Sequence, residues 1–165
     1  VIYTMWLKPK TKYNIVIGGA AGAFPPAIGW LSVSGSLDFL PILMFLIIFM
    51  WTPPHFWALS LYYLKDYKSA GFPMLPVVSG VKNTKTQIVV YSILMFFVTL
   101  MPYFLGYFGI IYFLTSLFLG LYFIYHSLKV FFDNTNKNKS IKMFLYSIVY
   151  LYILFLSMVI DYFMV

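Results

Sequence analysis

The chain has 165 residues, of which 62% are hydrophobic, 22% are aromatic and only 9% are charged. A water-soluble domain of this size needs far more charged surface, so the composition excludes a soluble protein and predicts an integral membrane protein. The absence of cysteine excludes a disulfide framework and a thiolate metal site. The formal net charge of +7 would suit nucleic acid, but the apolar segments exclude it as the expected partner.

Five segments are apolar enough to cross a bilayer, because a hydrocarbon core of ~30 Å requires about 20 mostly apolar residues per helix. These segments are residues 15–31, 37–64, 88–107, 109–132 and 141–160. The sequence therefore predicts an all-α, polytopic membrane helical bundle, in which residues 1–165 form a single membrane domain.

The charged residues favour one orientation of these spans. All eleven lysines fall on one side of the membrane, whereas Asp38 and Asp161 fall on the other. Lysine-rich loops remain in the cytoplasm, so the lysine side is predicted to be cytoplasmic. The first residues from Val1 read like the end of a helix entering a basic loop, and we expect the chain to be the C-terminal part of a longer protein.

The first span is rich in glycine and alanine. Gly18 and Gly22 have the spacing that lets two helices approach closely, and tight helix packing is the simplest interpretation. Pro25 and Pro26 lack backbone N–H groups and are expected to break or kink this helix.

The second span is longer than the bilayer is thick. Residues 37–64 would form a helix about 42 Å long at ~1.5 Å per residue. We expect this helix to tilt, break or extend into the cytoplasm, and Pro53 and Pro54 mark the expected place.

The same span carries polar residues at helical spacing. His55, Tyr62 and Asp66 fall within one narrow stripe, which we expect to line a cavity that opens toward the lysine side, because a polar stripe facing lipid is costly. Two simpler interpretations remain open. His55 could only hydrogen-bond a neighbouring carbonyl group, and Asp66 could only form an ion pair with Lys65 or Lys68.

Two segments carry several motifs of one family. They are "YTMWLKPKTKYNIVIGGAAGAFPPAIGW" and "WTPPHFWALSLYYLKDYKSAGFPMLPVV". Their Asn-Ile-Val-Ile-Gly-Gly, Phe-Pro-Pro, Pro-Pro-His-Phe-Trp and Asp-Tyr-x-x-Ala-Gly-x-Pro-Met-Leu-Pro motifs resemble the heme farnesyltransferase branch of the UbiA superfamily of intramembrane prenyltransferases. The later helices match only in hydropathy and placement. The resemblance implies a UbiA-type fold, with about five helices present of an expected nine.

The resemblance also implies an activity, the Mg²⁺-dependent transfer of a farnesyl group from farnesyl diphosphate to a vinyl group of heme b, with addition of water, to give heme O and diphosphate. In this superfamily two aspartate-rich loops hold Mg²⁺ and the diphosphate. Asp66 matches the leading aspartate of the second loop, and Ala70 stands where other branches repeat an aspartate, which favours heme over a quinone. The first motif would lie upstream of Val1, so this chain alone is expected to be inactive.

The stripe and the resemblance together assign expected roles. Asp66, His55 and Tyr67 are the candidate catalytic residues, with Asp66 as the metal ligand. The candidate contacts with diphosphate or heme are Lys8, Lys10, Lys12, Thr11, Asn14, Lys65, Lys68, Tyr62 and Trp57. Trp57, Tyr62 and Tyr67 would stabilise an allylic cation by cation–π contact. His55 would ligate the heme iron, hydrogen-bond the heme or transfer the proton of the water.

The expected location is the inner (cytoplasmic) membrane of a bacterium, with the active site on the cytoplasmic side. A terminal oxidase or a heme A synthase is a candidate partner besides the two substrates and the lipid bilayer. Two alternative functions remain open. The same fold could prenylate a quinone or another aromatic ring, which product analysis would reveal. A membrane subunit could instead hold heme between His55 and His126, which a stable bis-histidine spectrum without prenyl transfer would favour.

Overall fold

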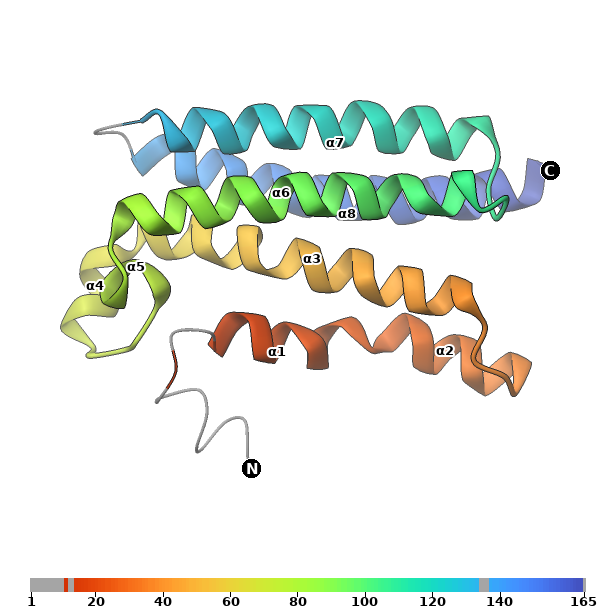
Figure 1. Ribbon diagram of the computed structural model, residues 1–165, viewed down its shortest axis with the longest axis horizontal. Helices are drawn as coiled ribbons and strands as arrows, with labels where there is room; N and C mark the ends of the chain where they lie inside the picture. The colour runs from red at the N-terminus through yellow and green to blue at the C-terminus, as the bar shows by residue number, and fades with distance from the viewer. Residues whose placement is uncertain (1–10, 12–13, 134–136, 165) are drawn as a thin grey trace.

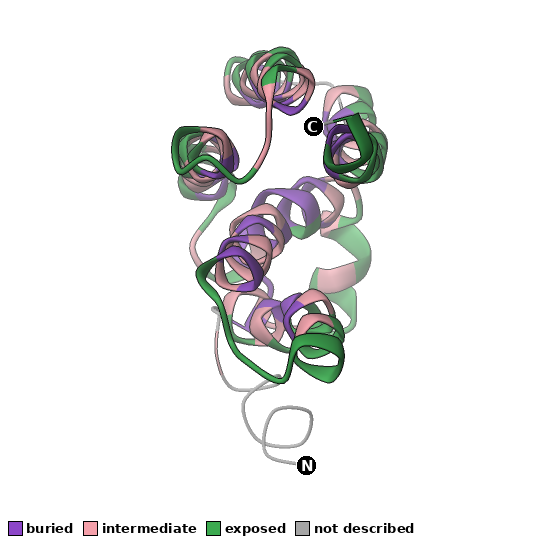
Figure 2. Cartoon of the chain, turned by 90° about the vertical axis from the view of Figure 1, so that its right-hand side faces the viewer, coloured by how far each residue is buried: buried purple, intermediate pink, exposed green. Residues whose placement is uncertain are grey.

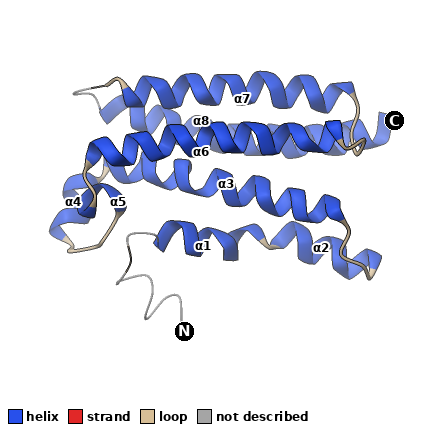
Figure 3. Cartoon of the chain, in the orientation of Figure 1, coloured by secondary structure: helices blue, strands red, loops and turns tan. Residues whose placement is uncertain are grey.

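The protein is a bundle of helices (Figures 1 and 3). This computed structural model describes residues 11, 14–133 and 137–164, and all regular secondary structure in these ranges is helical. The helices are α1 (Asn14–Ala23), α2 (Pro25–Ser34), α3 (Phe39–Tyr62), α4 (Leu64–Ser69), α5 (Leu75–Val78), α6 (Val81–Phe104), α7 (Ile110–Phe131) and α8 (Lys137–Met164).

Five helical segments are long and apolar enough to cross a membrane, which confirms the predicted bundle. They are Asn14–Ser34 (α1 with α2), Phe39–Tyr62, Val81–Phe104, Ile110–Phe131 and Asn138–Met164. Two helices begin earlier than predicted, α6 at Val81 and α8 at Lys137. Their first turns carry lysine, asparagine and threonine or serine. These residues can be helical but do not suit hydrocarbon, so hydropathy places the start of each helix too late.

Helix α3 lies at the centre of the bundle. It contacts α1 and α2 on one side and α6 and α8 on the other, while α7 packs against α6 and α8. In the end-on view, buried residues face the spaces between helices and exposed residues face outward (Figure 2). The outward surfaces of the spans expose large apolar side chains, such as Phe97, Phe118 and Tyr152. Such a surface is suited to lipid rather than to water.

Small hydroxyl side chains lie between the helices. Ser92 of α6, Ser116 and Ser127 of α7 and Ser157 of α8 are buried. Each donates its hydroxyl proton to a carbonyl three or four residues earlier in its own helix. These hydrogen bonds give each buried hydroxyl group a partner inside the bundle, where water would not reach it.

Two glycines allow close helix contacts. A Cβ atom at Gly19 of α1 would lie 2.8 Å from Thr52 Cγ2 of α3, and one at Gly120 of α7 would overlap the ring of Phe96 on α6. The expected close packing of the first span is therefore present at Gly19, whereas Gly22 of the predicted pair takes no part in it. A Cβ atom at Gly22 would meet no atom within 4 Å, because the spacing alone does not fix which face of α1 meets α3.

The two proline pairs behave differently. Helix α1 ends at Ala23 and α2 begins at Pro25, so Phe24 separates the two halves of the first span and the predicted break is confirmed. Pro53 and Pro54, in contrast, are buried inside a helix that continues to Tyr62. Of the three outcomes expected for the second span, a break at these prolines is therefore wrong. The helix ends beyond them, before Tyr63.

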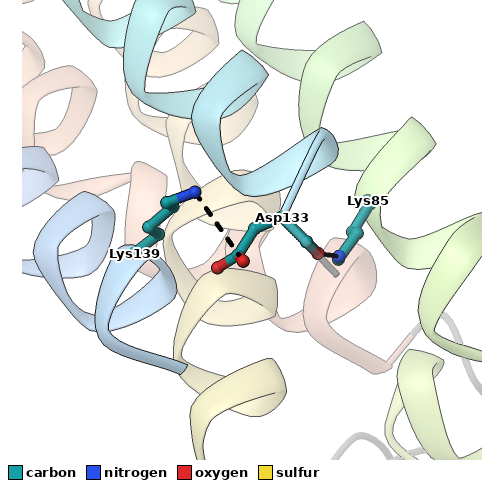
Figure 4. Close-up of polar contacts among 3 residues, drawn as sticks. All are labelled: Lys85, Asp133 and Lys139. Carbon is teal, nitrogen blue, oxygen red and sulfur yellow. Dashed lines mark hydrogen bonds and ion pairs between the residues drawn. The ribbon is translucent and has the colours of Figure 1, made fainter. Parts of the chain in front are cut away.

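The described lysines gather at one end of the bundle. They lie on α4, at the starts of α6 and α8, and in the last turn of α7, whereas Asp38 and Asp161 lie at the other end, before α3 and late in α8. At the lysine end, Lys85 Nζ donates to the backbone carbonyl of Asp133, and Lys139 Nζ lies 3.7 Å from the Asp133 carboxylate (Figure 4). Asp133 follows α7 and thus connects it to α6 and α8.

Candidate functional site

The predicted polar stripe is divided between two helices. Helix α3 ends at Tyr62, and α4 runs from Leu64 to Ser69 after Tyr63, whose backbone (φ −92°, ψ 27°) leaves the helical region. His55 therefore lies on α3 and Asp66 on α4, so a single continuous helical face does not contain both. This corrects the stripe prediction. The helical spacing that relates positions 55 and 66 does not continue through Tyr63, because the backbone there separates α3 from α4.

The imidazole of His55 is enclosed by aromatic rings. It stacks on Trp51, one turn earlier in α3, with ring centroids 4.1 Å apart, and on Phe144 of α8 at 4.5 Å. Phe56 approaches its edge at 4.9 Å. Its Nδ1 atom lies 2.6 Å from the hydroxyl of Ser147 on α8. His55 is 7% exposed and thus occupies a position defined by α3 and α8 together.

Trp51 forms a wall of two apolar cavities beside His55. Its indole N–H donates to the carbonyl of Ser147 over 2.9 Å, which fixes the ring against α8. One cavity, of about 430 Å³, is bounded by Pro25 and Pro26, α3 and α8. The second, of about 330 Å³, is bounded by α3 and by Gly18, Gly19 and Gly22 of α1. Ile48 and Trp51 border both cavities, so apolar space lies on either side of this part of α3.

The carboxylate of Asp66 is exposed on α4 at the lysine end. Its neighbours Lys65 and Lys68 are exposed as well. Within the described part of the chain, the ion pair of Lys139 with Asp133 is formed but none is formed by Asp66. The simpler interpretation, an ion pair with Lys65 or Lys68, is therefore not what the structure shows. The ranges that the structure describes contain no cluster of three or more acidic or histidine residues suited to a metal.

The three aromatic candidates occupy different settings. Tyr62 and Tyr67 are half-buried near the α3–α4 junction. Tyr62 packs edge-on against Tyr63, with 4.8 Å between centroids, and the ring of Tyr67 lies 6.4 Å from Phe72. Trp57 is only 1% exposed and belongs to the core. Its ring meets that of Tyr91 on α6 at 5.3 Å, so the structure places Trp57 in the core, between α3 and α6.

The candidates of the first loop are only partly visible. Lys8, Lys10 and Lys12 lie outside the described residues. Thr11 is half-buried, and its carbonyl accepts a hydrogen bond of 3.2 Å from the backbone N–H of Asn14. Asn14 is buried at the start of α1.

The two histidines do not face each other as a heme pair would require. His126 of α7 stacks on Tyr146 of α8, with centroids 5.1 Å apart, and meets Tyr122 edge-on at 4.7 Å. His55 instead contacts Phe144 and Ser147 of α8. Positions 146 and 147 are separated by about 100° around a helix, so the histidines approach α8 on different faces. This arrangement gives no support to a bis-histidine heme site.

Trp51, Phe144 and Ser147 of the His55 environment were not predicted from the sequence. Trp51 precedes His55 by four residues, a spacing that brings side chains together on a helix and could have identified it. Ser147 lies 92 positions away, in an apolar span with several similar serines. Nothing in its local sequence distinguishes it, because its contact with His55 depends on how α8 packs on α3.

Comparison with known proteins places the chain in a family. Residues 1–149 match the UbiA prenyltransferase family. Among curated relatives, the protoheme IX farnesyltransferase of Rickettsia bellii is 52% identical over 94% of this chain and 52% of its own length. The proteins of the same name from Novosphingobium aromaticivorans and Neorickettsia sennetsu are 51% and 49% identical, over 97% and 98% of this chain and 54% and 52% of their own lengths.

The chain thus spans about half the length of the curated relatives it matches. No solved structure matches it. The family match covers most of the chain, including both segments that carry the shared motifs and all of α3 and α4. The chain belongs to the UbiA prenyltransferase family.

Proposed function

We propose that this chain forms part of a heme farnesyltransferase. In the proposed reaction the C1–O bond of farnesyl diphosphate breaks, and diphosphate leaves with the bonding electrons. A new bond joins farnesyl C1 to a vinyl carbon of heme b, and water adds to the neighbouring vinyl carbon and releases a proton. The products are heme O and diphosphate. Support comes from relatives of that name, which are about 50% identical over nearly the whole chain.

The observation that carries this proposal is the exposure of the Asp66 carboxylate and its lack of an ion pair with the described residues. A carboxylate between two lysines can pair with one of them, but that of Asp66 is exposed and forms no ion pair with the described residues, so it is available to a ligand. Mg²⁺ is usually held by one or two carboxylates together with substrate phosphates and water, and a single available carboxylate fits that requirement. Bound Mg²⁺ would neutralise charge on the diphosphate as it leaves.

The basic residues of this end would assist Asp66. Lys65 and Lys68 on α4, with Lys8, Lys10 and Lys12 of the first loop, would attract the diphosphate and stabilise its growing charge. Tyr67 and Tyr62 are placed near the same helix junction and would contact the prenyl chain near its reacting end by cation–π interaction. Thr11 and Asn14 would add polar contacts with the substrates.

The apolar part of the reactants would lie beside α3. The cavities bordered by Trp51 offer an apolar environment for the farnesyl tail or the heme edge. His55, which stacks on Trp51, would position the heme. We further propose Trp51 in the aromatic role first assigned to Trp57, because Trp51 borders the cavities and Trp57 is enclosed in the core.

The proposed location follows from the charge distribution. Lysine-rich ends of membrane proteins remain in the cytoplasm, so the end that carries Asp66 would face the cytoplasm. The three relatives named above are bacterial, and the membrane would be the inner membrane. A terminal oxidase or a heme A synthase, which would use the product, is the proposed partner.

The test uses the full-length polypeptide in membranes, supplied with heme b, farnesyl diphosphate and Mg²⁺, with heme O measured by chromatography. Asp66→Asn should lower heme O formation by at least about 100-fold, as expected when a main electrostatic contact of the transition state is lost. Asp38→Asn, at the opposite end of the bundle, is the matched control and should keep normal turnover. Undiminished heme O formation by Asp66→Asn would remove Asp66 from the metal role, and prenylated quinone as the product would identify the other acceptor.

A further inference from the structure

The distances around the Ser147 hydroxyl group indicate which nitrogen of His55 carries the proton. The Ser147 oxygen lies 2.5 Å from the carbonyl oxygen of Phe144 and 2.6 Å from His55 Nδ1. A hydroxyl group has one proton to donate, and a carbonyl oxygen can only accept. Two oxygens approach to 2.5 Å only when a proton lies between them, so the hydroxyl proton points to Phe144. Ser147 then offers only a lone pair to Nδ1, and Nδ1 must carry the N–H.

The surrounding rings prevent the imidazole from turning away from this bond. Trp51 and Phe144 stack on its two faces at interplanar angles of 22° and 29°. Rotation of the imidazole by 180° would replace Nδ1 by a carbon at Ser147 and leave a buried hydroxyl group without its neighbour. The indole N–H of Trp51 also donates a hydrogen bond to the Ser147 carbonyl. Ser147 therefore holds both His55 and the Trp51 ring that stacks on it.

The other nitrogen, Nε2, is thereby left with a free lone pair. Nε2 forms no hydrogen bond with the residues that the structure describes, and His55 keeps 7% of its surface accessible. A neutral imidazole with one N–H bonded to a neighbour and its second nitrogen bare is the arrangement found in metal-bound histidines. The same arrangement excludes Nε2 as a hydrogen-bond donor to a heme carboxylate.

We propose that Ser147 is a positioning residue that holds His55 in the Nδ1-protonated tautomer and so presents Nε2 to the iron of the heme substrate. The identity of this ligand rests on the proposed function, whereas the tautomer does not. Ser147 itself touches neither substrate. Ser147 acts through the orientation of His55, as do the residues that hydrogen-bond metal-binding histidines in other proteins.

The tautomer is measured directly by nitrogen NMR. Full-length polypeptide labelled with ¹⁵N-histidine, free of heme and in lipid nanodiscs, gives separate signals for protonated and bare ring nitrogens, and the His55→Gln variant assigns those of His55. We expect a protonated Nδ1 and a bare Nε2. Ser147→Ala should move His55 toward the Nε2-protonated form, and Ser147→Thr, which keeps the hydroxyl group, should restore the original signals.

Heme binding provides the second measurement. Ferrous heme bound to the same protein should show a histidine–iron stretch in its Raman spectrum that His55→Gln abolishes. Ser147→Ala should shift this stretch and weaken heme binding by about 10-fold or more, as for outer-shell substitutions elsewhere. Ser157→Ala is the matched control. Ser157 is also buried in α8 and donates to a carbonyl three residues earlier, but it is not bonded to His55, so neither measurement should change.

The tautomer, the iron contact and the proposed function would each be contradicted by a different experimental result. A protonated Nε2 in the unaltered protein would overturn the tautomer, whatever the enzyme does. The expected tautomer combined with a heme spectrum that is insensitive to His55→Gln would overturn the iron contact and leave Nε2 as a proton acceptor for water. A protein with the expected tautomer that binds no heme would contradict the proposed function instead.

Discussion

The backbone N–H of Gly109 donates a hydrogen bond to the carboxylate of Asp161, so a residue late in α8 closes the N-terminus of α7. The N–H of Tyr112 approaches the second carboxylate oxygen at 3.4 Å. The first N–H groups of a helix have no partner within it, and a negative charge there is also favoured by the helix dipole. Asp161 is only 1% exposed, which makes it a structural acid at the end of the bundle opposite to Asp66.

Replacement of Asp161 should therefore destabilise the protein without a specific effect on chemistry. Asp161→Ala leaves buried N–H groups unpaired and should lower the free energy of unfolding by about 1–3 kcal/mol. Asp161→Asn keeps an acceptor oxygen and should lower it less. Thermal unfolding in detergent or nanodiscs measures the change. The control is Asp38→Asn, because Asp38 is exposed and asparagine keeps an acceptor for the exposed hydrogen bonds from Trp30 and Ser36. A loss in Asp38→Asn as large as that of Asp161→Ala would contradict this role.

The contact between Gly19 and Thr52 gives a prediction about packing. Gly19→Ala would bring a methyl group to 2.8 Å from Thr52 Cγ2 and should destabilise the protein by about 1–3 kcal/mol, the usual range for overpacking. Gly22→Ala adds the same group where no atom lies within 4 Å, so its stability should be unchanged or slightly increased. Thr52→Ser, which removes the crowded methyl group, should recover part of the Gly19→Ala loss. Equal effects of the two alanine variants would show that α1 packs on α3 through another face.

The two tryptophans of α3 should respond differently to substitution. Trp57→Leu creates a cavity in the core and should cost several kcal/mol, on the scale of about 3–5 kcal/mol for truncation of a buried aromatic ring. Trp51→Leu opens the wall of the cavities beside His55 and should mainly raise the KM for farnesyl diphosphate or heme. Thermal unfolding and steady-state kinetics of both variants test this difference. Loss of stability in Trp51→Leu with unchanged kinetics would assign Trp51 a packing role.

The spans could be predicted from the sequence because hydropathy and length are local properties. Most residues of each predicted segment fall within observed helices, and the described lysines and the two far aspartates separate as predicted. The break at Pro25 also follows from a local rule, since proline cannot donate at the start of α2. Pro53 and Pro54 obey the same rule but lie in a helix that is buried by α1, α6 and α8, and this packing keeps α3 continuous.

The candidate site could be predicted only in part. The sequence identifies His55 as an intramembrane polar residue and Asp66 by its motif. The relative position of the two side chains depends on Tyr63, where the backbone leaves the helix although no glycine or proline is near in the sequence after Pro54. Ser147 and Gly19 depend on the rotation of one helix against another, which sequence spacing does not fix. Trp57 belongs to the motif that includes His55, and only the packing of α6 shows that it is enclosed.

The stacking of Trp51 on His55 supplies the protein with an optical reporter. Indole emission is sensitive to the rings and charges in van der Waals contact with it, and a porphyrin nearby quenches it by energy transfer. The chain has four tryptophans, so a variant that retains Trp51 alone in this part of the protein would signal each arrival of a chromophore at the imidazole. Binding and departure could then be timed separately from turnover.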